Sequence, residues 1–202
     1  MPNTSLLPIK CQPKHLSDYA SIVPEVVDKI KQTAKPLKGV RIAHMNATSL
    51  GGGVAEMLRS VVPLQQDIGL DSRWYVIPPN EKFFKVTKEI HNFLQGKKGD
   101  LTKQQKQTYL EYSKFLAGLL AEIPADIFIV HDPQPAASLT FLNGQKPKLS
   151  IWRAAILIPP SLIKQSGTFY FPTFNLMTIW FLPCPSILTK LFPKIRSVSL
   201  PQ

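Results

Sequence analysis

The fold of this chain can be inferred from residues 38–58, KGVRIAHMNATSLGGGVAEML. Residues 40–46 follow a Lys-Gly turn and are rich in branched apolar side chains, which predicts a β-strand. Three glycines, Gly51, Gly52 and Gly53, come next, and apolar residues then recur at helical spacing from Val54. This segment therefore predicts a strand, a glycine-rich loop and a helix in direct succession.

The alternation of strand and helix continues to residue 153. Further strands are predicted at residues 73–77, 126–130 and 149–152, and helices at residues 16–34, 54–69, 81–94 and 101–123, with a short helix after residue 135. Pro24 predicts a kink in the first helix, and Pro63 predicts a kink or an early end in the second. Residues 1–15 are interpreted as an N-terminal extension.

Strands separated by helices imply an α/β fold, with a Rossmann-like parallel sheet that carries helices on both faces. Ligands bind at the carboxyl ends of the strands in such a sheet. The loops at residues 46–53 and 131–135 both leave carboxyl ends of strands. We therefore expect the two loops to lie at the same edge of the sheet, which makes that edge the candidate site.

The composition indicates a packed core, because 44% of the 202 residues are hydrophobic. Two cysteines, Cys11 and Cys184, are too few for a disulfide scaffold or a zinc site. The formal charge of +11 would suit nucleic acid, and Lys82, Lys85 and Lys88 form a helical stripe. A solvated helix face explains this stripe better, since no aromatic residues alternate with the lysines. No nucleic-acid partner is therefore expected.

The triple-glycine loop can adopt positive φ angles and lets a ligand approach the backbone closely. The helix that follows offers free N–H groups and the positive end of its dipole, which suits a phosphate. The loop lacks the GxGxxG and GK[ST] patterns, so it predicts neither a dinucleotide fingerprint nor a P-loop. A flexible turn is the alternative interpretation. Glu56 either accepts hydrogen bonds from sugar hydroxyls or complements the helix dipole.

The second loop contains His131 and Asp132, followed by Pro133, Gln134 and Pro135. A histidine and a carboxylate at a strand end can bind hydroxyl groups or assist proton transfer. Neighbouring residues on a strand point to opposite faces, so the two side chains need not act together. A histidine with purely structural hydrogen bonds is the alternative. No other histidine or carboxylate stands at metal-ligand spacing, so no metal is expected.

Five segments together resemble one enzyme family. They are LKGVRIAHMNATSLGGGVAEML from residue 37, PLQQDIGLDSRWYVI from residue 63, FFKVTKEIHNFLQG from residue 83, DIFIVHDPQP from residue 126, and WR at residues 152–153. In this order and spacing they look like the N-terminal half of the trehalose synthase type of glycosyltransferase. The resemblance covers residues 16–153. It implies a retaining enzyme that transfers glucose from a nucleotide diphosphate glucose to free glucose.

The resemblance also implies the GT-B architecture, in which two Rossmann-like domains face each other across a cleft. The N-terminal domain then holds the acceptor sugar, and a donor domain, which this chain does not contain, holds most of the nucleotide. It implies no metal and no cofactor besides the nucleotide-sugar co-substrate. The donor-side residues implied are Gly51, Gly52, Gly53 and Glu56, and the acceptor-side residues implied are Asn46, His131, Asp132, Gln134, Trp152 and Arg153.

Residues 154–202 differ from the rest of the chain. They contain no Asp or Glu, although about six would be expected at average usage. The family continues after Trp-Arg with Cys-His-Ile-Asp, whereas this chain continues with AAILIPPSLIKQ. A shifted reading frame restores a family-like sequence that includes DTS, VWDFL and DYMVF. We interpret the tail as the product of a frameshift near residues 153–156, which leaves a truncated glycosyltransferase with a poorly ordered, out-of-frame end.

Alternatives remain for the tail and for the function. The 25 uncharged residues between Lys164 and Lys190 are long enough for a membrane anchor, but three prolines interrupt them, so no membrane partner is expected. The first residues lack the apolar run of a signal peptide, which predicts a cytoplasmic protein. A fragment without the donor domain is expected to be inactive alone. The alternative function is a non-catalytic remnant or a weak sugar-binding or interaction module.

Overall fold

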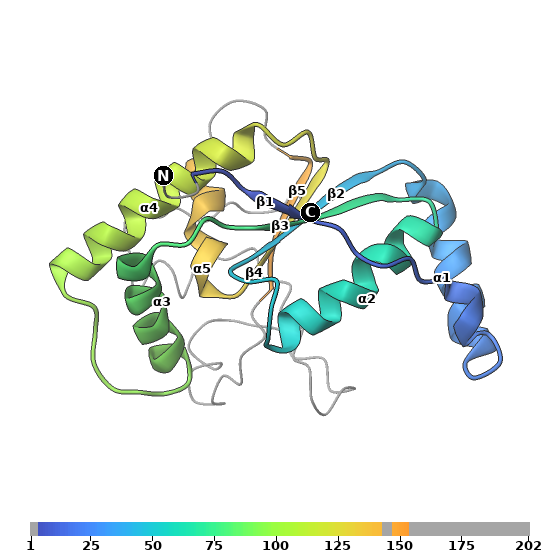
Figure 1. Ribbon diagram of the computed structural model, residues 1–202, viewed down its shortest axis with the longest axis horizontal. Helices are drawn as coiled ribbons and strands as arrows, with labels where there is room; N and C mark the ends of the chain where they lie inside the picture. The colour runs from blue at the N-terminus through green and yellow to red at the C-terminus, as the bar shows by residue number, and fades with distance from the viewer. Residues whose placement is uncertain (1–3, 143–146, 154–202) are drawn as a thin grey trace, which may run out of the picture.

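The computed structural model describes residues 4–142 and 147–153 (Figure 1). The predicted tail, with its frameshift and membrane-anchor interpretations, lies outside these residues. The described part is an α/β fold with a five-stranded sheet in the order β1–β3–β2–β4–β5. The strands are β1 (Leu7–Ile9), β2 (Arg41–Asn46), β3 (Asp71–Val76), β4 (Ile127–His131) and β5 (Leu149–Arg153).

Four of these strands form the predicted parallel sheet. Strand β2 pairs in parallel with β3 and with β4, and β4 pairs in parallel with β5. Strand β1 lies antiparallel on β3, with Leu7 opposite Val76. It falls within the predicted N-terminal extension, and the sequence pattern does not reveal it because three residues are too few to show a period of two.

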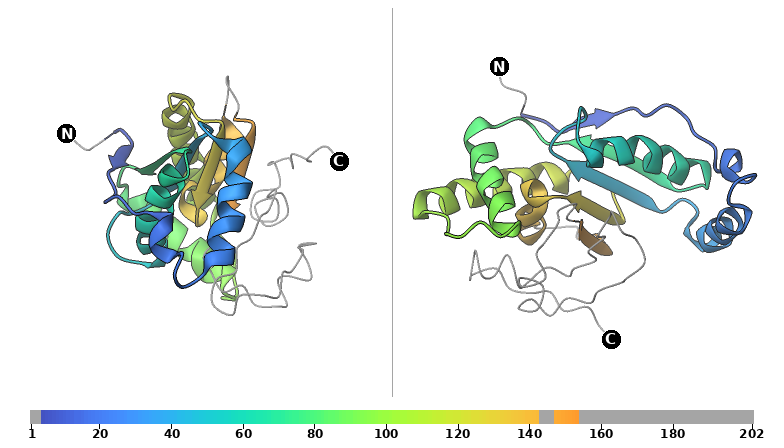
Figure 2. Two further views of the ribbon diagram at one scale, coloured as in Figure 1. Left: turned by 90° about the vertical axis from the view of Figure 1, so that its right-hand side faces the viewer. Right: turned by 90° about the horizontal axis from the view of Figure 1, so that it is seen from below.

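Helices cover both faces of the sheet, as predicted (Figures 1 and 2). The α-helices are α1 (Pro24–Ala34), α2 (Gly53–Asp67), α3 (Glu81–Leu94), α4 (Lys103–Ala121) and α5 (Pro133–Ala136), and the 3-10 helices are η1 (Leu16–Tyr19), η2 (Lys35–Leu37) and η3 (Ala137–Phe141). Leu58 and Val62 of α2 pack on Trp74 at one face. Helices α3, α4 and α5 pack on the other face, where Met45 and Val130 are fully buried.

The predicted kink at Pro24 is wrong, and so is an early end of α2 at Pro63, while a kink at Pro63 stays a prediction. Residues 16–34 do not form one kinked helix, because α1 begins at Pro24 and only the short η1 precedes it. Proline suits a first helical position, since its missing N–H would have no partner there and its φ is already helical. Pro63 does not end α2 early, because this helix continues to Asp67 with Pro63 on its buried side. The packing of α2 on the sheet outweighs the lost hydrogen bond.

Helices α3 and α4 begin at side chains that satisfy free backbone N–H groups. The Asn80 side chain accepts a hydrogen bond from the backbone N–H of Phe83 at 2.9 Å. Thr102 and Gln105 form a capping box at the start of α4. The helix predicted after residue 135 instead starts at Pro133, inside the loop. Among the described residues, none of the helices combines the length and the apolar character that crossing a membrane requires.

Candidate functional site

A cleft of about 420 Å³ lies at the carboxyl edge of the sheet. It is bounded by the β2–α2 loop, by helix α3 and by the start of α5. Its lining residues are Ala47, Thr48, Phe84, Thr87, Lys88, His91, Asp132 and Gln134. The two loops therefore lie at the same edge of the sheet, as predicted. The volume is within the range of small-molecule sites.

Asp132 stands in the cleft with an unusual backbone. Its φ of 63° and ψ of 179° fall in a region that is almost restricted to glycine. Three hydrogen bonds hold this turn: Asp132 N–H donates to Arg153 O at 2.8 Å, Trp152 Nε1–H donates to Asp132 O at 2.9 Å, and the Tyr109 hydroxyl donates to Pro133 O at 2.7 Å. A strained residue that its surroundings hold in place is typical of a ligand-binding turn.

The wall opposite Asp132 comes from one face of α3. Burial lowers the pKa of His91, and the nearby charge of Lys88 lowers it further, against an opposing effect of Asp132. His91 is therefore a neutral imidazole near pH 7. The Thr87 hydroxyl donates to Phe84 O at 3.1 Å, so its lone pairs remain acceptors. Together the cleft offers a carboxylate, an ammonium group, a neutral imidazole and hydroxyl groups beside the Phe84 ring, which suits a neutral ligand rich in hydroxyl groups.

The predicted donor-side residues lie outside this cleft. Gly51 and Gly52 have φ angles of 68° and 80°, so the backbone of the loop does require glycine there. Gly53 begins α2, and Glu56 follows in its first turn. All four of these residues are exposed. Their contact with donor phosphates and sugar stays a prediction.

Asn46 and Trp152 support the loops and are not among the residues that line the cleft. The Asn46 side chain accepts a hydrogen bond from Trp74 Nε1–H and donates one to Thr48 O, both at 2.7 Å. The buried Trp152 donates to the backbone of Asp132. Of the six predicted acceptor-side residues, the structure brings only Asp132 and Gln134 into the cleft lining. His131 and Arg153 are buried beside it.

His131 belongs to a buried histidine pair under α2. Its Nε2 lies 3.2 Å from Nδ1 of His44, and Nε2 of His44 lies 2.8 Å from Oε1 of Gln65. Burial lowers the pKa of His44 to about 4 and that of His131 to about 2, and the positive charge of Arg153 disfavours protonation of both rings. Both histidines are therefore neutral at physiological pH.

Acidification from pH 7 to pH 5 should destabilise the fold by on the order of 2 kcal/mol for each of these two histidines. The unfolded rings bind protons below their ordinary pKa of 6.5, whereas the folded rings stay neutral to about pH 4 or lower. Stability is therefore lost as the pH falls through this window. Urea unfolding at several pH values measures it. The loss should persist in His15→Gln, whose ring is mostly exposed, and weaken in His44→Gln; a flat profile in the unsubstituted chain would contradict the prediction.

The contribution of α3 to the cleft wall was not predicted from the sequence. Phe84, Thr87, Lys88 and His91 stand at positions i, i+3, i+4 and i+7, which is one helix face. This face combines an aromatic, a hydroxyl, an amine and an imidazole side chain, and that combination was the available signal. The lysine stripe favours a solvated helix face, whereas Lys88 lines the cleft. His44 and Gln65 were missed as well, because they are 21 residues apart in sequence.

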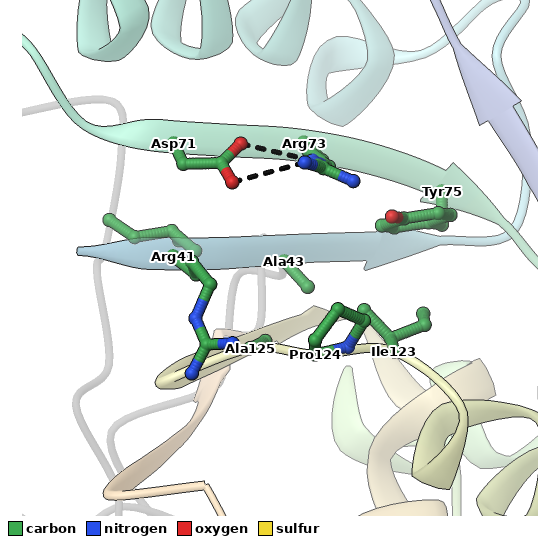
Figure 3. A pocket seen from close by; sticks show the side chains of 9 residues that line it. Arg41, Ala43, Asp71, Arg73, Tyr75, Ile123, Pro124 and Ala125 are labelled. Atoms are coloured by element: carbon green, nitrogen blue, oxygen red, sulfur yellow. Dashed lines mark hydrogen bonds and ion pairs between the residues drawn. The ribbon is translucent and has the colours of Figure 1, made fainter. Parts of the chain in front are cut away.

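A second cavity lies at the opposite, amino edge of the sheet (Figure 3). Its volume is about 10 Å³, which holds one water molecule at most. Asp71 and Arg73 form an ion pair at its rim, at 2.9 Å. This cavity is too small for a substrate, so the cleft at the carboxyl edge is the better candidate.

Comparison with known proteins gives the same result as the residue pattern. The family described as "Trehalose synthase, N-terminal domain" matches residues 44–165, more than half of the chain. Trehalose synthases from Thermococcus litoralis and Rubrobacter xylanophilus are 44% identical to it over 152 and 147 residues, which cover 74% and 71% of this chain and 36% and 35% of theirs. A trehalose phosphorylase from Grifola frondosa is 28% identical over 142 residues, which cover 65% of this chain and 19% of that protein.

The chain thus spans about a third of the length of the trehalose synthases that it matches. The match begins at His44 in the central strand and includes both loops of the cleft. Because the matched segment, the parallel sheet and the cleft agree, the chain belongs to the trehalose synthase family of glycosyltransferases.

Proposed function

We propose that the cleft at the carboxyl edge binds glucose as the acceptor of a retaining glycosyl transfer from a nucleotide diphosphate glucose. The observation that carries this proposal is the convergence of Asp132, Lys88 and His91 on one cleft of suitable volume. A carboxylate accepts hydrogen bonds from sugar hydroxyls, and an ammonium group donates them. The similarity to trehalose synthases supports glucose as the sugar, because trehalose consists of two glucose units.

The donor is proposed to approach from the side of the triple-glycine loop. The N-terminus of α2 presents backbone N–H groups and a positive dipole end, which favour a diphosphate. The cleft then orients the acceptor hydroxyl toward the anomeric carbon, so this part of the chain contributes proximity. Stabilising the leaving diphosphate needs further positive groups that face it. A second domain of the GT-B kind is proposed to supply them, so the 202-residue chain alone should show no turnover.

Titration of the labelled 202-residue chain with glucose, followed by NMR, tests the proposal. Backbone amide shifts should change at Ala47, Thr48 and His91, which line the cleft, and remain unchanged at the amino edge, for example at Arg41, which does not. Lys88→Gln should weaken binding several-fold, since it removes a charged donor from the cleft lining. The matched control is Lys85→Gln on the same helix, because Lys85 is exposed, pairs with Glu81 and does not line the cleft.

Equal weakening in both variants would show that the effect is one of net charge. Absence of glucose-dependent shifts would contradict the proposal and favour the alternative function, a non-catalytic remnant. Turnover by the pure chain with a nucleotide diphosphate glucose and glucose would contradict the need for a second domain, although the sugar site would stand.

A further inference from the structure

A line of polar groups runs beneath α2 from β3 to the carboxyl end of β4. The Ser72 hydroxyl donates to Oε1 of Gln65 at 2.7 Å, and the same oxygen lies 2.8 Å from Nε2 of His44. Nδ1 of His44 in turn lies 3.2 Å from Nε2 of His131. Ser72, His44 and His131 are each at most 2% exposed. The proposed glucose site makes no direct use of Ser72, Gln65 or His44.

The direction of the hydrogen bonds follows from the chemistry of the amide. An amide oxygen only accepts, so His44 carries its proton on Nε2. A neutral imidazole has one proton, and burial keeps His44 neutral at physiological pH. Nδ1 of His44 is therefore bare and accepts a hydrogen bond. His131 must donate that bond from Nε2, which leaves its own Nδ1 without a proton.

The line ends in an acceptor without a donor. Within residues 4–142 and 147–153, Nδ1 of His131 is buried and has no hydrogen-bond partner. The same holds for Nη1 of Arg153, which occupies the paired position on β5. A buried polar atom that lacks a partner costs about 1–3 kcal/mol. A hydroxyl group could satisfy either atom, because it can donate to a ring nitrogen and accept from a guanidinium.

We propose that Ser72 and Gln65 are positioning residues that act through His44 on His131. They hold the proton of His131 on Nε2, so that Nδ1 remains an acceptor for a hydroxyl group bound at the carboxyl ends of β4 and β5. The assignment of this hydroxyl to a sugar rests on the proposed function. The direction of the hydrogen bonds from Ser72 to His131 does not depend on the proposed function.

The protonation pattern can be measured directly on the 202-residue chain. The chain contains four histidines, so selective ¹⁵N labelling gives a small set of ring signals, and single His→Gln variants assign them. Two-bond ¹H–¹⁵N correlations show which nitrogen carries each proton. We expect His44 and His131 to be protonated at Nε2 and bare at Nδ1 at pH 7. A proton on Nδ1 of His131 would overturn the proposal, because it requires the Gln65 amide to face the opposite way.

Gln65→Glu should move the ring proton of His131 from Nε2 to Nδ1. A carboxylate beside Nε2 raises the pKa of His44, and the protonated ring then donates from Nδ1. His131 must accept at Nε2, so its own proton moves to Nδ1. The matched control is Gln104→Glu, an exposed change on α4 that adds the same charge and should leave the tautomer unchanged. Ser72→Ala is the second variant, and it should give mixed tautomers because the Gln65 amide loses the donor that orients it.

If Ser72 and Gln65 had only a structural role, the tautomer of His131 would be the same in every folded variant. That result would refute a positioning role. If a variant fails to fold, the tautomers measured in the unsubstituted chain still give the direction of the hydrogen bonds. Addition of glucose should shift the Nδ1 signal of His131. Correct tautomers without this shift would reject the sugar as the source of the hydroxyl while the positioning role stands.

Discussion

Asp132→Gly should be more stable than Asp132→Ala by about 1–2 kcal/mol, and both variants should lose glucose binding. The usual order is the opposite, because glycine loses more backbone entropy on folding and costs about 0.4–1 kcal/mol relative to alanine. Here the backbone of Asp132, at φ 63° and ψ 179°, costs a side-chain residue about 1–3 kcal/mol. Glycine removes this strain, and the net difference favours the glycine variant.

Urea unfolding gives the two stabilities, and the NMR titration gives the affinities for glucose. Neither substituted residue has a carboxylate, so the comparison separates backbone strain from the loss of the charged group. If alanine were as stable as glycine at this position, the strain would be absent. Retained glucose binding in both variants would remove Asp132 from the acceptor site. The expected outcome is a residue that costs stability and contributes binding.

Phe83→Ala should lower the free energy of unfolding by about 3–5 kcal/mol. The Phe83 ring is 0% exposed and stacks on Tyr109 at a centroid distance of 5.6 Å, with Tyr112 at 4.4 Å. Its removal leaves a cavity between α3 and α4, and the loss is a large part of the roughly 5–15 kcal/mol that a domain has in total. Because α3 forms one wall of the cleft, glucose binding should weaken as well.

Thermal and urea unfolding of the variant measure this loss. The control is Phe115→Ala on α4, where the ring is 39% exposed and removal should cost much less. Similar losses in the two variants would contradict the burial assigned to Phe83. A stable Phe83→Ala chain that still binds glucose would show that α3 does not need this contact to keep the cleft wall in place.

The sequence predicted the sheet and the common edge of the two loops because both depend on chain order. Strands joined by helices must run parallel, and parallel neighbours place their carboxyl ends together. The side chains that reach the cleft were harder to predict. A helical pattern shows which residues of α3 are buried, yet it does not show that His91 faces a turn 41 residues later. That depends on how α3 packs on the sheet.

Strand alternation allowed His131 and Asp132 to face different ways, whereas the family resemblance placed both on the acceptor side. Because side chains alternate along β4, His131 faces α2 and contacts His44. The positive φ of Asp132 instead directs that residue to the cleft, which it lines. A positive φ at a non-glycine residue cannot be predicted from HDPQP alone. Tertiary hydrogen bonds from Trp152 and Tyr109 hold it.

The frameshift interpretation of residues 154–202 stays a prediction, because these residues lie outside the described ranges. The family match continues to residue 165, beyond the boundary expected at residue 153. The coding DNA between Trp152 and the stop codon decides the matter. A reading frame shifted by one base should encode a sequence that resembles the continuation of the family.

Strand β1 has a consequence for the order of assembly. It joins Ile9 to Trp74 across 65 positions through only three residue pairs, and two of its three residues are exposed. Closing such a long segment costs roughly 4 kcal/mol of chain entropy, against little buried area. The chain should therefore complete its parallel strands before this antiparallel one docks, and β1 should be the first strand to detach when the native state opens.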